Sequence, residues 1–389
     1  MPKPTALSSE LAELASQGLR RQRRHVESPC AARMLVDGRE LLAFASNDYL
    51  GLASHPALAK ALAEGARRWG AGSGASHLVS GHLAPHQQLE DALAGFLGFP
   101  RVLTFSTGYL ANLAVIPTLT GRGDAIFADK LNHASLIDGV RLSHADSQRY
   151  AHNDMAALER LLAASSAPCK LIASDAVFSM DGDLAPLAEL LALAERYDAW
   201  LLIDDAHGFG VLGPHGEGSL AHCGIGYHPR IVLMGTLGKA AGVGGAYVAG
   251  SAEVIEYLLQ KARSYIFTTA APPAVACALL QSLELIRNGQ ALRATLKAHI
   301  ARLQAGLADL PWTLLPSPTA IQPLLVGDNQ ATLDLANALW QRGIWAPAIR
   351  PPTVPRGSAR LRISLSAAHT AADIEQLIAA LRDLATLNS

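Results

Sequence analysis

The chain has 389 residues, of which half are hydrophobic and 17% are charged, and its 32 Lys and Arg nearly balance its 33 Asp and Glu. This is enough apolar material for a large core and a second, smaller domain, while a formal net charge of -1 favours small-molecule chemistry over nucleic acid or an anionic membrane as the partner. The four cysteines form no C-x-x-C pair, which argues against a disulfide framework or a structural zinc site and favours a reducing cytoplasm.

Residues 1–50 are predicted to form an N-terminal arm. An amphipathic helix is expected first, because leucines recur at helical spacing at Leu7, Leu11, Leu14 and Leu19. A basic cluster at 20–24 and a short strand at about 41–45 follow. Acidic residues interrupt the arm early, and no later stretch approaches the ~20 apolar residues of a membrane span, so we expect a soluble, unexported, cytoplasmic protein.

The middle of the chain, 51–289, is predicted to be a large α/β domain. Short apolar runs alternate there with helix-like stretches, and the runs lie at 102–105, 125–128, 171–178, 200–203, 231–234 and 245–249. Strands that are buried on both faces give such continuous apolar runs, so we expect a mostly parallel, helix-covered sheet.

A boundary is expected at Asn288-Gly289, and the rest of the chain, 290–389, is predicted to be a small α+β domain. It offers a helix at about 290–309, strand candidates near 312, 321, 344 and 361, and a final helix at about 371–385.

The apolar run at 200–203 ends in two carboxylates, Asp204 and Asp205, and His207 follows. Ligands of open α/β sheets bind at the carboxyl ends of strands, so Asp204 and His207 are candidate site residues. The alternative is that Asp204 only caps the next helix.

A lysine follows the next strand in the same way. Lys239 lies within Gly-Thr-Leu-Gly-Lys-Ala-Ala-Gly, where small residues allow close approach of a ligand and an apolar setting favours a nucleophilic amine that can form an imine. A phosphate-binding Walker A loop fails here, because Leu233 stands in place of the first glycine and Ala240 in place of Ser or Thr.

A third signal is the strand, turn and helix start at 105–112. Backbone N–H groups of a helix N-terminus bind phosphate, and the hydroxyls of Ser106 and Thr107 are at hand. The glycine-rich run at 70–76 does not match a dinucleotide fingerprint, since no strand precedes it. His82 and His86 have the spacing of a metal pair, but we find no third ligand to complete a site, so they are interpreted as solvated or structural histidines and no metal is expected.

An anchor for phosphate, a carboxylate and an imine-forming lysine are together the parts that pyridoxal 5'-phosphate (PLP) needs. Over nearly its whole length the sequence resembles the α-oxoamine synthases, which have the PLP transferase fold type I. The segments that carry the resemblance are 46–52, 72–81, His86 with Leu89-Glu90, 143–154, 178–187, 204–213, 235–246 and 350–364.

The resemblance implies that PLP binds in the large domain. Lys239 is then the Schiff-base lysine and proton carrier, Asp204 the partner of the pyridine nitrogen, and His133 the residue stacked on the ring. The remaining implied contacts to the cofactor are His207 and Ser179 at its phenolic oxygen, Thr236, Gly108 and Tyr109 at its phosphate, and Thr268 and Thr269 at the phosphate of a neighbouring subunit's cofactor. The last pair implies a homodimer with shared sites.

The resemblance also implies the substrates. The RPPTVPRG segment and His86-x-x-Leu89-Glu90 favour the branch that condenses L-alanine with pimeloyl-CoA or pimeloyl-acyl carrier protein in biotin biosynthesis, giving 8-amino-7-oxononanoate, CO2 and a free thiol. The implied substrate contacts are Arg362 and Asn47 for the amino-acid carboxylate, His133, Thr353, and Arg21 for the acyl donor.

Several alternatives stay open at this point. His133 and Thr236 are also plausible helix caps, Ser179 a turn hydroxyl and Arg362 a surface arginine. His77, Leu237 and Ala241 depart from residues common in the family, which leaves room for glycine or serine with another acyl thioester. A protein that binds PLP without turnover is the remaining possibility.

Overall fold

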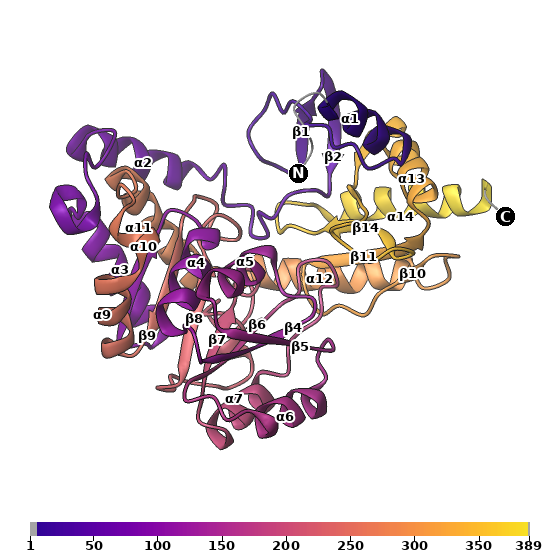
Figure 1. The fold of residues 1–389 in the computed structure, drawn as a ribbon. Coiled ribbons are helices and arrows are strands. Elements are labelled where there is room, and N and C mark those ends of the chain that lie inside the picture. Colours follow the sequence, from indigo (N-terminus) through magenta and orange to yellow (C-terminus); the bar gives the residue numbers. More distant parts are fainter. Residues whose placement is uncertain (1–5, 388–389) are drawn as a thin grey trace. The chain divides into compact units, whose positions relative to one another are not determined.

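The computed structural model describes residues 6–387 and divides the chain into two compact units (Figure 1). The large unit consists of Leu50–Ser179 and Asp183–Arg293. The small unit consists of the described residues up to Tyr49, the short stretch Met180–Gly182, and the residues from Ala294 onward. The N-terminal residues that the sequence sets apart as an arm therefore share a unit with the C-terminal part of the chain.

The large unit is built on a seven-stranded sheet with the order β3-β9-β8-β7-β6-β4-β5. Its strands are β3 (Arg101–Phe105), β4 (Ala125–Asp129), β5 (Asp146–Tyr150), β6 (Lys170–Asp175), β7 (Ala199–Asp204), β8 (Ile231–Thr236) and β9 (Ala246–Gly250). Neighbours pair in parallel except at β9, which is antiparallel to both β3 and β8. The expected mostly parallel sheet is confirmed.

The six apolar runs of the sequence all became strands of this sheet, and β4 and β9 are buried along their full length. Side chains such as Ile172, Leu202 and Val232 are completely buried, and each such burial contributes about 1.5–3 kcal/mol to the hydrophobic driving force. The seventh strand, β5, was not predicted. Its sequence Asp-Ser-Gln-Arg-Tyr is polar because β5 lies at the sheet edge, where its first four residues are exposed.

Helices cover both faces of this sheet: α4 and α5 lie on one side, and α6 and α7 on the other (Figure 1). The helical segments of the large unit are α2 (Pro56–Trp69), the π-helix η2 (His77–Gly81), α3 (Ala84–Leu97), α4 (Gly108–Leu119), α5 (Ala134–Ser143), α6 (Met155–Ala164), α7 (Leu187–Arg196), α8 (Ser219–His222), α9 (Ala252–Lys261), α10 (Arg263–Ile266) and α11 (Pro273–Arg287). Side chains that precede helices cap several of them, including Thr107 for α4 and Asp154 for α6.

The small unit contains two sheets. In the first, β1 (Arg33–Val36) and β2 (Arg39–Ala43) form a hairpin, and β12 (Ile344–Trp345) joins β2 in parallel. The second has the order β10-β11-β14-β13, with β10 (Thr313–Leu314), β11 (Ile321–Gly327), β13 (Ala348–Ile349) and β14 (Ala359–Ser364). Its helices are α1 (Leu7–Ser16), α13 (Asn329–Gln341), α14 (Ala371–Leu387) and the part of α12 (Gln290–Gly306) that begins at Ala294.

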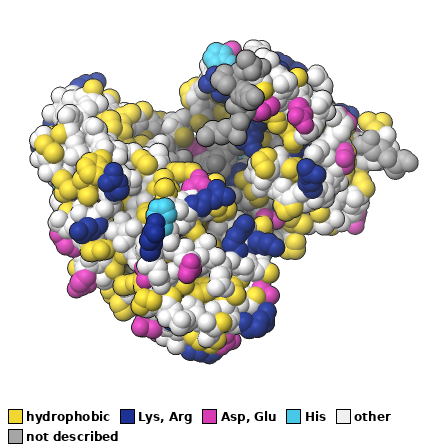
Figure 2. All heavy atoms as spheres, in the orientation of Figure 1, with side chains coloured by type: hydrophobic (Ala, Val, Ile, Leu, Met, Phe, Trp, Pro, Cys, Tyr) yellow, Lys and Arg dark blue, Asp and Glu magenta, His cyan; other side chains and the backbone are white. Residues whose placement is uncertain are grey.

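Basic and acidic side chains are interspersed on the face drawn in Figure 2, in keeping with the near-zero net charge. Among residues 6–387, none of the helices combines the length and the apolar character that crossing a membrane requires.

Candidate active site

Asp204 and Lys239 follow two neighbouring strands of the large sheet. Asp204 ends β7, where it pairs in register with Met234 of β8, and Lys239 lies three residues beyond the end of β8 in the loop that leads to β9. The Nζ of Lys239 is 2.7 Å from Nε2 of His207, which follows β7. The parallel pairing of β7 and β8 thus brings the predicted carboxylate, imidazole and amine to the carboxyl ends of these two strands.

Asp204 is only 3% exposed and its carboxylate is held by two neutral donors. Asn112 Nδ2 donates to Oδ2 over 2.8 Å, and the backbone N–H of Ala206 donates to Oδ1 over 3.1 Å. Asp204 does not cap a helix, because α8 begins only at Ser219. The adjacent Asp205 accepts from the backbone N–H of Ser219, so Asp205 is the carboxylate that supports that helix.

His133 has a structural task in addition to its predicted role at the ring. It is the N-cap of α5, and its Nδ1 accepts from the backbone N–H of Ser135 and lies 2.7 Å from the Ser135 hydroxyl. Ser135 in turn accepts from Nδ2 of Asn112, so a chain of hydrogen bonds links His133 to Asp204. Burial lowers the pKa of His133, with Asp204 acting in the opposite direction and Lys239 adding to the decrease. The imidazole is therefore neutral at pH 7.

Sequence reasoning missed Asp175, which ends β6 directly opposite Asp204 in the register of β6 and β7. Its Oδ2 accepts the backbone N–H of His133 over 2.7 Å and so fixes the start of α5. Burial raises the pKa of Asp175 well above its usual range, and the charge of Asp204 raises it further. The available signal was one acidic residue inside the apolar run at 171–178. Asn112, equally missed, stands out in the same way within the apolar helix α4.

The predicted phosphate anchor lies at the N-terminus of α4. Thr107 caps this helix by accepting from the N–H of Leu110, and Gly108 and Tyr109 are its first residues, whose N–H groups have no partner within the helix itself. The Tyr109 hydroxyl donates to Asp138. Thr236 is not a helix cap: it ends β8, and its hydroxyl donates to the carbonyl of Gly245 over 3.1 Å, which closes the loop that carries Lys239.

The structure places three further predicted residues in the large unit. Ser179 lies in a turn that follows β6. Thr268 and Thr269 follow α10, and Thr269 forms an isolated antiparallel bridge with Ser76. Their predicted contacts to a cofactor stay predictions.

The substrate residues expected at 21, 47, 353 and 362 all lie in the small unit. Arg362, in β14, is 6% exposed, which rules out the alternative of a surface arginine. Its Nη1 donates to Asn47 Oδ1 over 3.0 Å and its Nη2 to the hydroxyl of Tyr49 over 3.3 Å. Tyr49 was not predicted, although it belongs to the 46–52 segment that carries the family resemblance.

Arg21 and Thr353 also meet in the small unit, where Nη2 of Arg21 donates to Oγ1 of Thr353 over 3.3 Å. Arg350 lies close enough to feel the charge of Arg21. Burial, and to a smaller extent that charge, lower the pKa of the Arg350 guanidinium. Two arginines and a hydroxyl are a donor set suited to an anion such as a phosphate.

The residues of the large unit fit PLP by the chemistry of their donors. Two buried carboxylates, Asp175 and Asp204, are held mainly by neutral groups, and buried acidic groups favour a cationic partner such as a protonated ring nitrogen. A lysine amine beside an imidazole and a helix N-terminus supply groups for the aldehyde and the phosphate.

Known proteins match nearly the whole chain. The family model for aminotransferase class I and II matches residues 39–381. An 8-amino-7-oxononanoate synthase from Dechloromonas aromatica (strain RCB) is 71% identical over 382 residues, which are 97% of this chain and 99% of the relative.

Solved structures agree with the sequence relatives. The structure of a serine palmitoyltransferase with PLP superimposes with a TM-score of 0.93 at 29% identity, covering 98% of this chain and 97% of that one. The crystal structure of an 8-amino-7-oxononanoate synthase from Francisella tularensis gives a TM-score of 0.78 at 32% identity, covering 90% and 98%.

Proposed function

The chain belongs to the aminotransferase class I and II family, within its 8-amino-7-oxononanoate synthases, and we propose that it condenses L-alanine with a pimeloyl thioester. The products are 8-amino-7-oxononanoate, CO2 and the free thiol, and the reaction serves biotin biosynthesis. PLP is the cofactor. The observation that carries the proposal is that Lys239, in contact with His207, and the buried carboxylate of Asp204 follow the paired strands β8 and β7 at their carboxyl ends.

PLP, when bound, supplies an electron sink for the electron pair that loss of a proton leaves at the α carbon of the amino acid. We assign that proton to Nζ of Lys239, which takes it up and later returns it. The Nε2 of His207, 2.7 Å away, orients the amine through a hydrogen bond. Asp204, oriented by Asn112 and Ala206, holds a proton on the ring nitrogen, since a buried carboxylate stabilises a cation next to it.

We assign the amino-acid carboxylate to Arg362. A guanidinium can hold both oxygens of a carboxylate, and Asn47 and Tyr49 fix the plane of this side chain. We assign the anionic end of the acyl donor to Arg21 with Thr353, where Arg350 adds a second positive charge. The residues of the small unit bind and orient the two substrates, whereas Lys239 transfers the proton.

We also propose a homodimer in which Thr268 and Thr269 contact the cofactor phosphate of the partner. Large apolar side chains are exposed near this pair: Phe267 is 70% and Val79 is 79% exposed, and the bridge between Ser76 and Thr269 joins their two segments. Apolar side chains exposed to this degree on two segments that a bridge joins favour coverage by a second protein surface.

The decisive experiment compares substrates with the purified holoenzyme. L-alanine, glycine and L-serine are each combined with pimeloyl-CoA, acetyl-CoA and palmitoyl-CoA, and free thiol and the mass of the product are measured, with pimeloyl-acyl carrier protein as a further donor. We expect thiol release and 8-amino-7-oxononanoate with L-alanine and a pimeloyl thioester. Preference for another pair, or transfer of the amino group to a keto acid without thiol release, would overturn the proposal.

A further inference from the structure

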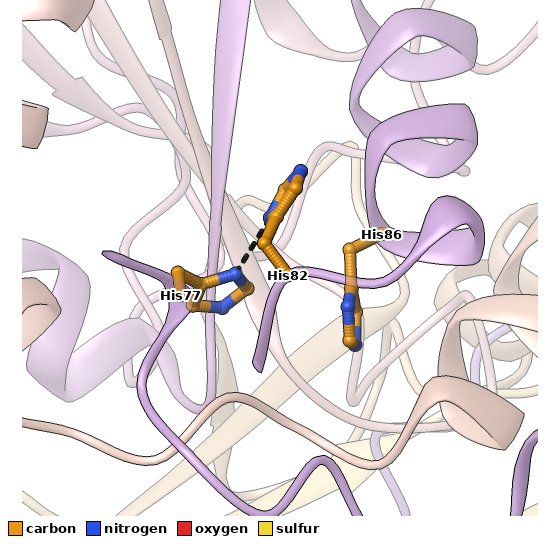
Figure 3. A group of neighbouring side chains, drawn as sticks. All are labelled: His77, His82 and His86. Carbon is orange, nitrogen blue, oxygen red and sulfur yellow. Dashed lines mark hydrogen bonds between the residues drawn. The ribbon is translucent and has the colours of Figure 1, made fainter. Parts of the chain in front are cut away.

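Three histidines of the large unit converge outside the residues assigned to catalysis. His77 belongs to η2, His82 follows that helix, and His86 lies in the first turn of α3. Each histidine offers one ring nitrogen, and these three nitrogens all lie within 4.8 Å of one another. Figure 3 shows the three imidazoles side by side. The sequence pointed only to His82 and His86, at i, i+4 spacing, and the fold adds His77 as the third.

We propose that His77, His82 and His86 bind a divalent transition-metal ion of the Zn²⁺ type through their imidazole nitrogens. Three imidazoles with an open fourth position form a common protein site for Zn²⁺, whose bonds to nitrogen are about 2.0–2.1 Å long. Nitrogens bound in this way lie about 3.3 Å apart in a tetrahedron. The nitrogens here lie on both sides of this value, since the Nδ1 atoms of His77 and His82 are 2.8 Å apart and one nitrogen of each of the three histidines lies within 4.8 Å of the other two.

The contact between His77 and His82 is the strongest indication. Their Nδ1 atoms lie 2.8 Å apart, so one carries a proton and the other directs its lone pair at it (Figure 3). A proton that sits between two nitrogens takes the place that a metal ion can take. The other ring nitrogen of His82, Nε2, lies 3.2 Å from Oε1 of Gln87. This hydrogen bond holds the imidazole with its Nδ1 directed at His77.

His86 is held on both sides. Its Nδ1 accepts the backbone N–H of Leu83 over 3.0 Å, and its Nε2 donates to the carbonyl of Ala271 over 2.8 Å. Binding through Nδ1 exchanges only the Leu83 contact for the metal. It keeps the donation to a backbone carbonyl, which metal-bound histidines usually make with their second nitrogen.

The surroundings of His77 favour a rigid ligand. The His77 ring stacks on Tyr265 with centroids 4.9 Å apart, and Tyr265 is 3% exposed.

An entry route and a source of negative charge are also present. A cavity of about 230 Å³ is lined by His77, His82, Glu90 and Asp91 among others. Glu90 is 6% exposed and its carboxylate accepts from the backbone N–H and the hydroxyl of Thr104. A cation beside it offsets part of the charge that a buried carboxylate carries, and water in the cavity can fill the fourth position.

The test is a titration of tag-free holoenzyme, freed of metal by a chelator and dialysis, with Zn²⁺ in a calorimeter. We expect one Zn²⁺ per chain with a dissociation constant in the micromolar range or below. His77→Gln and His82→Gln should each weaken binding at least ~10-fold. His215→Gln removes an exposed histidine elsewhere in the large unit and serves as the matched control.

Folding is checked by the PLP content and melting temperature of each variant, so that a loss of binding is not mistaken for a loss of structure. Co²⁺ provides a second measurement, because tetrahedral nitrogen ligation gives ligand-field bands that must disappear in the His82→Gln variant. Absence of stoichiometric Zn²⁺ binding, or binding that both cluster variants leave unchanged, would overturn the proposal.

Discussion

Asn112 donates a hydrogen bond of 2.8 Å from Nδ2 to Oδ2 of Asp204, and the two side chains are 0% and 3% exposed. The same nitrogen donates to Oγ of Ser135 over 2.9 Å, and Ser135 contacts Nδ1 of His133. A single amide therefore orients both the carboxylate assigned to the ring nitrogen and the imidazole assigned to the ring face. The Nδ2 group of this buried amide is paired, whereas its Oδ1 has no hydrogen-bond partner among the described residues, and such a cost inside an apolar helix suits a position that serves the site rather than the core.

We expect Asn112→Leu to weaken PLP binding about 10- to 100-fold, because a hydrogen bond to a charged group is worth about 1.5–3 kcal/mol. Titration of the apoprotein with PLP, followed by visible absorbance, measures the effect. Thr120→Val is the matched control, since it removes a buried hydroxyl bonded to the carbonyl of Ile116 at the other end of α4. Equal PLP affinity in the Asn112→Leu variant and the parent would contradict the assigned role.

Lys239→Ala is expected to remove the covalent link to PLP and to lower kcat by about 10³-fold or more, since the amine is both the nucleophile and the proton carrier. Borohydride reduction followed by peptide mapping checks the first point, and thiol release checks the second. Lys261→Ala, at the exposed end of α9, should change neither. Cofactor trapped on another lysine would refute the assignment.

Arg362→Lys is expected to raise the KM for L-alanine about 10- to 100-fold and to change the KM for the thioester little. Lysine keeps the charge but loses the fork that holds two carboxylate oxygens. Steady-state kinetics with each substrate varied in turn measures both constants. Arg302→Lys, an exposed arginine paired with Glu375, is the control. A change confined to the thioester would assign Arg362 to the acyl donor instead.

His152 makes stability depend on pH. Burial alone lowers its pKa, but hydrogen bonds to Asp129 and Asp183 and their charges raise the pKa to about 10. The folded pKa lies above the ordinary 6.5, so the stabilisation is complete below about pH 6.5 and is lost as the pH rises toward 10.

His152→Gln should therefore lower the free energy of unfolding by about 2 kcal/mol at pH 6, allowing for solvent screening of a side chain that is 26% exposed, and by much less at pH 10. Urea unfolding at several pH values measures this. His222→Gln, at an exposed position, should leave the pH profile of the parent intact. A difference between His152→Gln and the parent that is constant from pH 6 to 10 would rule out the ion pairs as its cause.

Much of the large unit could be predicted from local sequence. Apolar runs such as 200–203 and 231–234 became strands, and the positions of Asp204 and Lys239 directly after them placed both at one edge of the sheet. Strand β5 was not predicted, because a strand at the edge of a sheet needs no apolar run. The link between residues 6–49 and the C-terminal residues was not predicted either, since the pairing of Leu42 with Ile344 joins segments about 300 residues apart.

The sequence by itself determined the six buried strands of the large sheet, the turns after them and the residue types that PLP chemistry needs, because burial and turn preference are properties of short segments. Only the tertiary structure decided that Asn112 meets Asp204, that Asp175 stands opposite it, and that His77 completes a group with His82 and His86. Such contacts depend on strand order, register and the close approach of loops. Those features are set by the packing of distant segments, and such packing produces no periodic pattern in the amino-acid sequence.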